Sequence, residues 1–491
     1  MEIKPLFVSK NCKWKYKSVI LLLVFVLIMG IQVNAEESQE SFALSANCVL
    51  KDKNTISYKA TLPGTPMSDD GKVYLYALQP YEYSVPVTAT PLAEKELSNN
   101  PSFEIALKDS AGGTRLYNKF ALVVKQAGQN VMIAVPQYIT NPEILAQFTR
   151  PRLNRSFKSV QGVDFANLLV SGNIMGVMYG GNYTTIQVLN EGNDQSVTNP
   201  YARVDKKATD SHPIKARYYM LNASDPQGIT KLANELTQCA AYTNIENFII
   251  GNEVNNRSWN YMSWTDWPTY VREYVQEFRV AYNAIKSQNA NANVYICIDQ
   301  YWDVNQTPDN KEYYETMDAK DFILMFNDQM AKEGNVDWNV AQHPYLTPLT
   351  YAKFWDMSDC PKGDYREELV KSGKYVTFQN LSVLTDFLQS PILLNTSGKV
   401  RDVILSEIGV TNEQGEEVQA ASMCASYVAA KDNPYVSEII YLLTYNDPKM
   451  DTRLSGQSQL VYDSMGGANS QVYEEWAKAY IGINDWSEIL K

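Results

Sequence analysis

Short runs of alternating apolar and polar residues fill the chain from about residue 40 to about residue 150. Turn-forming stretches such as PGTP, SDDGK and SAGG separate the runs TISYKATL, KVYLYAL, SFEIALK, KFALVVK and NVMIAVPQYI. A period of two is typical of strands that bury one face, and regular turn signals between them favour an antiparallel arrangement. We therefore predict a β-sandwich-like N-terminal domain over residues 36–152.

From about residue 158 the pattern changes, and short apolar strands alternate with long amphipathic helices. The clearest helix is predicted from Pro268 to about Lys286, and its apolar side chains share one face: Val271, Tyr274, Val275, Phe278 and Tyr282. The spacing of these five residues matches the helical repeat of 3.6. This part of the chain is therefore of the α/β class.

Eight strands can be counted in this region: SVQGVD, MGVMYGG, ARYYML, NFIIGNE, NVYICIDQ, WNVAQHPYL, DVILSEIGV and SEIIYLLTYND. Helical patterns between successive strands imply a parallel sheet that is covered on both faces. We predict a (β/α)₈ TIM barrel over residues 153–491. A doubly wound open sheet is the alternative, but no G-x-G-x-x-G or P-loop motif at a strand end supports it.

The first 35 residues have the pattern of an export signal. Five lysines precede an apolar run from Val19 to Ile31, and a small residue, Ala35, follows. The run is short for a membrane span, so we predict a cleaved signal peptide over residues 1–35 and a secreted protein; a retained N-terminal anchor is the alternative.

Removal of this segment, with its five lysines and one glutamate, changes the net charge from −12 to −16. An acidic surface without a basic stripe argues against nucleic acid or an anionic membrane as a partner. The five remaining cysteines are far apart, and the chain has only two histidines, His212 and His343. We therefore expect no zinc ribbon, no multi-histidine metal site and no cofactor.

Polar residues stand where the predicted barrel strands end. The fourth strand ends in Asn252 and Glu253, the sixth in His343 and Tyr345, and the seventh in Glu407. The carboxyl ends of barrel strands meet on one face, which carries the reactive groups in this fold. If strand alternation continues, Glu253 shares a face with Ile249 and Gly251, and Glu407 shares one with Val403 and Leu405. The two carboxylates would then converge.

Two converging carboxylates suit the hydrolysis of a glycosidic bond. One carboxyl group protonates the leaving oxygen, while the second acts at the anomeric carbon, directly as a nucleophile or through a water molecule. Repulsion between the two groups and partial burial raise one pKa, so that one carboxyl group keeps its proton near neutrality.

The motifs GNE after strand four, HPY after strand six and SE in strand seven resemble those of clan A glycoside hydrolases, the retaining 4/7 superfamily of (β/α)₈ barrels. The resemblance covers roughly residues 158–485 and extends to an uncharacterised family of secreted bacterial barrels in that clan. It implies that Glu253 is the acid/base and Glu407 the nucleophile. It further implies that Asn252 binds the sugar 2-hydroxyl and that Tyr345 or His343 contacts Glu407.

Strand eight departs from the clan pattern, because Tyr445 stands where many members carry a tryptophan under the sugar. Trp259 and Trp302 follow strands four and five and could stack on sugar rings, or could instead pack loops onto helices. The predicted function is a retaining glycoside hydrolase acting on a poly- or oligosaccharide. A non-catalytic carbohydrate-binding or cell-surface protein is the alternative, and the low histidine count disfavours a metal-assisted hydrolase.

Overall fold

The computed structural model describes residues 42–148, 158–161, 166–170, 173–180, 182–189, 200–203, 218–241, 245–262, 266–305, 316–361, 367–441 and 470–491. The predicted export signal, residues 1–35, and Tyr445 lie outside the described residues. Within these ranges, no helix is long and apolar enough to cross a membrane.

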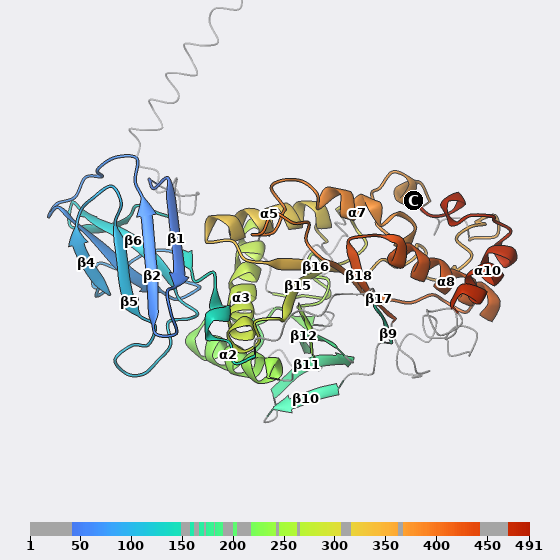
Figure 1. The fold of residues 1–491 in the computed structure, drawn as a ribbon, viewed down its shortest axis with the longest axis horizontal. Coiled ribbons are helices and arrows are strands. Elements are labelled where there is room, and N and C mark those ends of the chain that lie inside the picture. Colours follow the sequence, from blue (N-terminus) through green and yellow to red (C-terminus); the bar gives the residue numbers. More distant parts are fainter. Residues whose placement is uncertain are drawn as a thin grey trace, which may run out of the picture. The chain divides into compact units, whose positions relative to one another are not determined.

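The N-terminal region forms two antiparallel sheets (Figure 1). The first sheet has the order β1-β2-β5, with β1 (Ser45–Leu50), β2 (Thr55–Thr61) and β5 (Ser102–Ala106). The second has the order β4-β3-β6-β7, with β4 (Ala93–Glu96), β3 (Lys72–Leu78), β6 (Lys119–Gln126) and β7 (Gln129–Met132), and β8 (Gln137–Tyr138) also pairs with β6. Ile56 and Phe103 from the first sheet share a buried core with Leu75 and Phe120 from the second. The antiparallel arrangement agrees with the alternating sequence pattern, and the domain limits stay a prediction.

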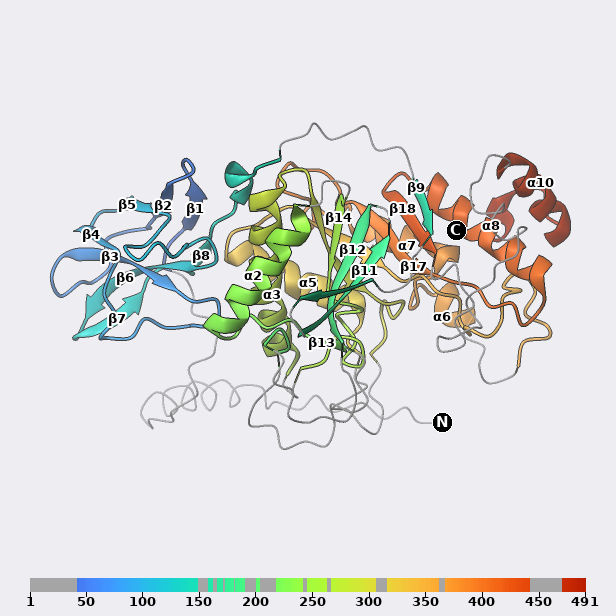
Figure 2. The same ribbon diagram turned by 90° about the horizontal axis from the view of Figure 1, so that it is seen from below.

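The rest of the chain is built around a parallel sheet with helices (Figures 1 and 2). Among the described strands, the parallel neighbours are, in order, β12 (Tyr183–Leu189), β14 (Asn247–Ile250), β15 (Asn293–Ile298), β16 (Trp338–Gln342), β17 (Val403–Ile408), β18 (Val436–Tyr441) and β9 (Lys158–Gln161). The earliest of these strands in the sequence, β9, therefore pairs with the last, β18. The mixed α/β class is thus the one that the strand and helix patterns predict.

The prediction that MGVMYGG and ARYYML form the second and third parallel strands of a barrel is wrong. β10 (Ala166–Val170), β11 (Asn173–Gly180) and β12 pair with one another antiparallel, and the predicted third strand contributes only β13 (Tyr218–Tyr219), antiparallel to β12. Gly180 pairs with Tyr183, so only Gly181 and Asn182 separate β11 from β12. A Gly-Asn dipeptide between two strands is a hairpin signal, and it identifies β12 rather than β11 as the strand that continues the parallel sheet. The described strand path ends at β10 and β9, and no pairing among the described residues closes it into a barrel.

Helices α2 (Pro226–Ala240), α3 (Trp267–Gln288) and α5 (Ala319–Lys332) follow strands on this sheet. Further along are the helices α6 (Glu367–Lys371), α7 (Ser382–Phe387), α8 (Glu416–Asp432) and α10 (Ser470–Ile481), and the 3₁₀ turns η1 (Pro142–Leu145), η3 (Phe378–Asn380) and η4 (Trp486–Glu488). Helix α3, the longest in the described ranges, begins one residue before the predicted Pro268, and Asp266 caps it by accepting a hydrogen bond from the backbone N–H of Thr269 at 2.8 Å.

Helix α3 is buried over more of its surface than its apolar face alone predicts. Gln276, Arg279 and Asn283 are buried together with the predicted apolar residues. The Asn283 side-chain nitrogen donates a hydrogen bond to the Leu116 carbonyl oxygen at 2.9 Å. A contact with the loop before β6 thus covers a polar position that an amphipathic pattern alone assigns to solvent.

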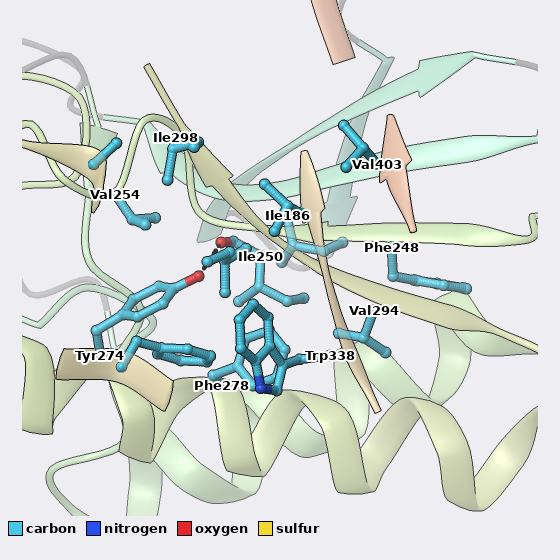
Figure 3. Close-up of a cluster of buried hydrophobic side chains, with 14 of the residues drawn as sticks. Ile186, Phe248, Ile250, Val254, Tyr274, Phe278, Val294, Ile298, Trp338 and Val403 are labelled. Carbon is cyan, nitrogen blue, oxygen red and sulfur yellow. Dashed lines mark hydrogen bonds between the residues drawn. The ribbon is translucent and has the colours of Figure 1, made fainter. Parts of the chain in front are cut away.

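The parallel sheet is buried on both faces. On one face, strand residues such as Ile250 and Val294 pack with Tyr274 and Phe278 of α3, as Figure 3 shows, and the Tyr274 hydroxyl donates to the Ile250 carbonyl oxygen at 2.7 Å. On the other face, two side chains from β15 and one from each of five other parallel strands form a smaller inner cluster: Tyr183, Ile249, Tyr295, Cys297, Ala341, Ile404 and Ile440. Through Cys297, the inner cluster contacts Glu253 and His343 of the candidate site.

Candidate active site

Glu253 lies in a tight turn directly after β14. Gly251 and Glu253 both have left-handed backbone torsions, with φ of 78° and 43°. A Cβ atom on Gly251 would lie 2.6 Å from Val254 Cγ1, so this position needs glycine for space as well as for its torsion. Strand alternation ends at Ile250 and does not set the direction of Glu253. The prediction that the strand pattern continues through residue 253 is therefore wrong.

Glu407 lies within β17, next to an irregularity in its pairing with β18. The register shifts between Leu405 and Ile408, as it does between Val403 and Ile404. Ile404 belongs to the inner cluster, whereas Val403 and Leu405 pack on the helix side of the sheet. Simple alternation would place Glu407 on the helix side with Leu405, which corrects the prediction that these residues share the inner face. An irregularity of this kind redirects side chains at the end of a strand.

The two carboxylates meet at one imidazole ring. His343 follows β16 directly and is 3% exposed, while the side chains of Glu253 and Glu407 are 13% and 21% exposed. His343 Nδ1 lies 2.9 Å from Glu253 Oε1, and His343 Nε2 lies 3.6 Å from Glu407 Oε2. The Tyr345 hydroxyl donates a hydrogen bond to Glu407 Oε1 at 2.5 Å. The structure thus brings together four of the residues that the strand ends single out.

The surroundings of His343 favour its protonated form. Burial lowers the pKa of His343, but the contacts with Cys297, Glu407 and Glu253 outweigh burial and bring the pKa well above its ordinary value. Burial and the neighbouring Glu407 charge also raise the pKa of Tyr345, which keeps its hydroxyl proton available to Glu407. A cation and a neutral donor therefore offset the repulsion between two half-buried acidic groups.

Two residues at the end of β15 complete the site and carry no function in the sequence analysis. Cys297 Sγ lies 3.3 Å from His343 Nε2, and the backbone N–H of Glu253 points to the same sulfur at 3.4 Å. Asp299 is 3% exposed, and burial followed by the Glu253 charge raises its pKa to about 8. Their spacing of two residues places Cys297 and Asp299 on one strand face, and this spacing is the signal that could have revealed them.

Asn252 and Trp259 lie in the same loop as Glu253. Asn252 is buried beside the acidic residue, at 6% exposure. Trp259 is half-buried, and its ring centre lies 5.9 Å from that of Tyr218 at an angle of 33°. Within the described part of the chain, Tyr218 is the aromatic neighbour of Trp259, which keeps a partly open surface.

Trp302 does not face the site. It is 4% exposed, and its ring packs edge-on against Phe387 at 5.1 Å within the helix-side cluster. The prediction that Trp302 stacks on a sugar is therefore wrong, and the loop-packing alternative applies. Tyr445, the residue that departs from the clan pattern, lies outside the described residues.

The fold and the site define an α/β protein with two acidic residues held close together at the ends of parallel strands. The chain belongs to DUF5722, a family of unknown function, which matches residues 174–489. No curated protein matches the chain.

Solved structures that the chain is similar to include several glycoside hydrolases. The catalytic domain of GH53 from Ignisphaera aggregans shares 15% identity over 44% of this chain and 54% of that chain, with a TM-score of 0.26. A GH5 protein from Streptomyces cattleya, in complex with Manβ1-4GlcNAc, shares 14% identity over 51% of this chain and 55% of that chain, with a TM-score of 0.27. A family 39 glycoside hydrolase from the gut symbiont Bacteroides cellulosilyticus shares 12% identity over 81% of this chain and 74% of that chain, with a TM-score of 0.31. The chain thus spans about half the length of the first two.

Proposed function

We propose that this protein is a secreted retaining glycoside hydrolase, built as a (β/α)₈ barrel after an antiparallel β-sandwich. Glu253 is the acid/base and Glu407 is the nucleophile. The observation that carries the proposal is that both carboxylates reach the same imidazole, at 2.9 and 3.6 Å, from the ends of strands β14 and β17. A paired arrangement at this end of a parallel sheet is what double displacement at an anomeric carbon requires.

In the first step, Glu407 attacks the anomeric carbon while the glycosidic C–O bond breaks and the Glu253 carboxyl group gives its proton to the leaving oxygen. The product is a glycosyl ester of Glu407. In the second step, the Glu253 carboxylate takes a proton from a water molecule, and that water displaces Glu407 at the anomeric carbon. The sugar leaves with its original configuration, and Glu253 is protonated again.

In each glutamate, one carboxylate oxygen is held by a neighbouring side chain and the other is the oxygen that takes part in the reaction. Glu407 Oε1 accepts the short hydrogen bond from Tyr345, whereas Oε2 lies at the longer distance of 3.6 Å from His343 Nε2, so Oε2 is the oxygen that attacks. Glu253 Oε1 is held by His343, which leaves its Oε2 for the leaving oxygen. Tyr345 donates a hydrogen bond to Glu407 and stabilises its carboxylate when it is expelled in the second step.

The substrate class is a poly- or oligosaccharide. Asn252 lies next to the acid/base, where an amide can bind the hydroxyl beside the anomeric carbon. The partly open Trp259 ring suits the apolar face of a sugar. Tyr445 takes the place of the tryptophan expected under the sugar in this clan, and no metal or cofactor takes part in the mechanism.

The test is hydrolysis of a glycan panel by the wild-type protein and by Glu253→Ala and Glu407→Ala. We expect both variants to lose at least about 100-fold in kcat/KM on unactivated substrates. Glu413→Ala, an exposed glutamate in the loop after β17, is the matched control and keeps wild-type activity.

Chemical rescue and labelling distinguish the two roles. Azide added to Glu253→Ala should yield a glycosyl azide of retained configuration, whereas azide added to Glu407→Ala should yield the inverted one. An activated 2-fluoroglycoside should label Glu407. Labelling at another residue, or unchanged turnover in both variants, rejects the assignment. Glycan binding without hydrolysis by the wild-type protein favours the non-catalytic carbohydrate-binding alternative.

A further inference from the structure

The Asp299 carboxyl group sits inside a network of hydrogen bonds to the turn that carries Glu253. Its Oδ1 accepts from Asn255 Nδ2 at 2.7 Å and from the backbone N–H of Tyr301 at 2.9 Å, and its Oδ2 accepts from Asn256 Nδ2 at 3.4 Å. In return, Asn255 Oδ1 accepts from the backbone N–H of Asp299 at 3.1 Å. Asp299 and Asn255 are therefore joined by a reciprocal pair of bonds.

The turn needs such support because its backbone is strained. A residue other than glycine in the left-handed region has a strained backbone and stays there only when its surroundings enforce it. Glu253, with φ of 43°, is such a residue. Its carbonyl oxygen accepts from the backbone N–H of Asn256 at 2.7 Å, and the backbone N–H of Val254 donates to the Cys297 carbonyl oxygen at 2.7 Å. The turn is thus bound to β15 at two levels, first through Cys297 and then through Asp299.

We propose that Asp299 is a positioning residue: by binding Asn255 and Asn256, it holds Glu253 in the left-handed conformation that aims its carboxyl group at the leaving oxygen. The inference rests on the proposed function, because the consequence of a displaced Glu253 is measured as lost acid catalysis. Asp299 does not touch the substrate in this role. Asn255 and Asn256 are buried, and the Asn255 amide divides its two donors between Asp299 and the Met317 carbonyl oxygen, the latter at 2.9 Å, so loss of Asp299 leaves a buried donor without its partner.

The kinetic test compares two aryl glycosides of the same sugar. A dinitrophenyl leaving group departs without protonation, whereas a phenyl leaving group needs the proton from Glu253. For Asp299→Ala we expect kcat/KM to fall about tenfold or more on the phenyl glycoside and less than about threefold on the dinitrophenyl glycoside. Asp299→Asn keeps the Oδ1 acceptor for Asn255 and Tyr301, so it should recover part of the loss.

A matched control separates positioning from general destabilisation. Asp402 accepts hydrogen bonds from the hydroxyls of Tyr295 at 2.6 Å and Ser437 at 2.8 Å, at the opposite end of the strands. Asp402→Asn should lower the thermal midpoint but leave the ratio of the two kcat/KM values unchanged. If Asp299→Ala lowers kcat/KM equally on both glycosides, the inference is overturned while the proposed function stands.

A crystal structure of Asp299→Ala tests the inference without any activity measurement. We expect Glu253 to leave the left-handed region and its carboxylate to move away from His343 Nδ1. An unchanged φ at Glu253 overturns the positioning role. A wild-type protein that cleaves neither glycoside nor any panel glycan overturns the proposed function instead, so the two failures are distinguishable.

Discussion

At the scale of single residues, the shortest contact to the proposed nucleophile is the hydrogen bond from Tyr345. Tyr345→Phe removes a hydrogen bond to a charged, half-buried carboxylate, which contributes about 1.5–3 kcal/mol. We expect kcat/KM to fall roughly 10- to 100-fold, mainly through kcat. The control is Tyr351→Phe, whose hydroxyl binds the Asp356 carbonyl oxygen in the loop after the same strand. Equal kinetics for wild type and Tyr345→Phe would contradict the assigned role.

The raised pKa of His343 makes stability depend on pH. An unfolded histidine titrates at about 6.5, and the folded protein holds the proton to a much higher pH. The stabilisation is therefore fully present below the unfolded pKa and is lost as the pH rises through the folded pKa.

Urea unfolding of wild type and His343→Gln between pH 6 and pH 9 measures this effect. The difference in free energy of unfolding should shrink as the pH rises. His212→Gln, at the other histidine of the chain, controls for generic effects of the substitution. A difference that stays constant over this range would show that His343 is not held as a cation.

Strand-end position was enough to single out Glu253, Glu407, His343 and Tyr345 from the sequence, because parallel strands deliver their last residues to one edge. The orientation of the glutamates was not predictable, since it depends on a positive φ and a register shift that no periodicity encodes. A role for Asp299 was not predictable from the sequence, because its partner Asn255 lies 44 residues earlier in the chain.

At the scale of elements, the turn after β14 depends on glycine. Gly251→Ala forces alanine into the left-handed region, at a cost of about 1–2 kcal/mol, and adds a contact of 2.6 Å to Val254. We expect a lower free energy of unfolding together with a large loss of kcat/KM.

Gly398 provides the matched control for this substitution. Its φ of 72° is similar, but a Cβ atom there meets nothing within 4 Å. Gly398→Ala should carry the conformational cost alone and leave kcat/KM unchanged. If both variants behave alike, the close packing around Gly251 has no part in holding the site.

The helices and the later strands were predictable because each has a long, uninterrupted pattern. Helix α3 is the clearest case, with its Asp266 cap and its row of apolar residues. The arrangement of the region before β14 was not predictable, because β10, β11 and β12 are short apolar runs, and such runs occur in parallel and in antiparallel strands alike. Only the Gly181-Asn182 dipeptide separated the two possibilities there.

At the scale of the whole molecule, the N-terminal segment predicts the destination of the protein. Expression in a bacterium with an intact export pathway should give a product that begins at Glu36, found outside the cytoplasm. Intact-mass measurement and N-terminal sequencing check this outcome, and replacing the apolar run of residues 19–31 with a polar one should keep the full-length chain inside. A product that retains Met1 in the membrane fraction would favour the anchor instead.

The pairing of β9 with β18 sets the order in which this protein can be completed. Lys158 of β9 pairs with Glu438 of β18. During synthesis, β9 therefore has to wait for β18 until nearly all of the chain has been made. Contacts between such distant residues carry a large loop-closure cost and slow folding. A chain that stops before β18 therefore exposes the edges of β17 and β9, which would otherwise pair with β18. Exposed strand edges of this kind bind chaperones and promote aggregation.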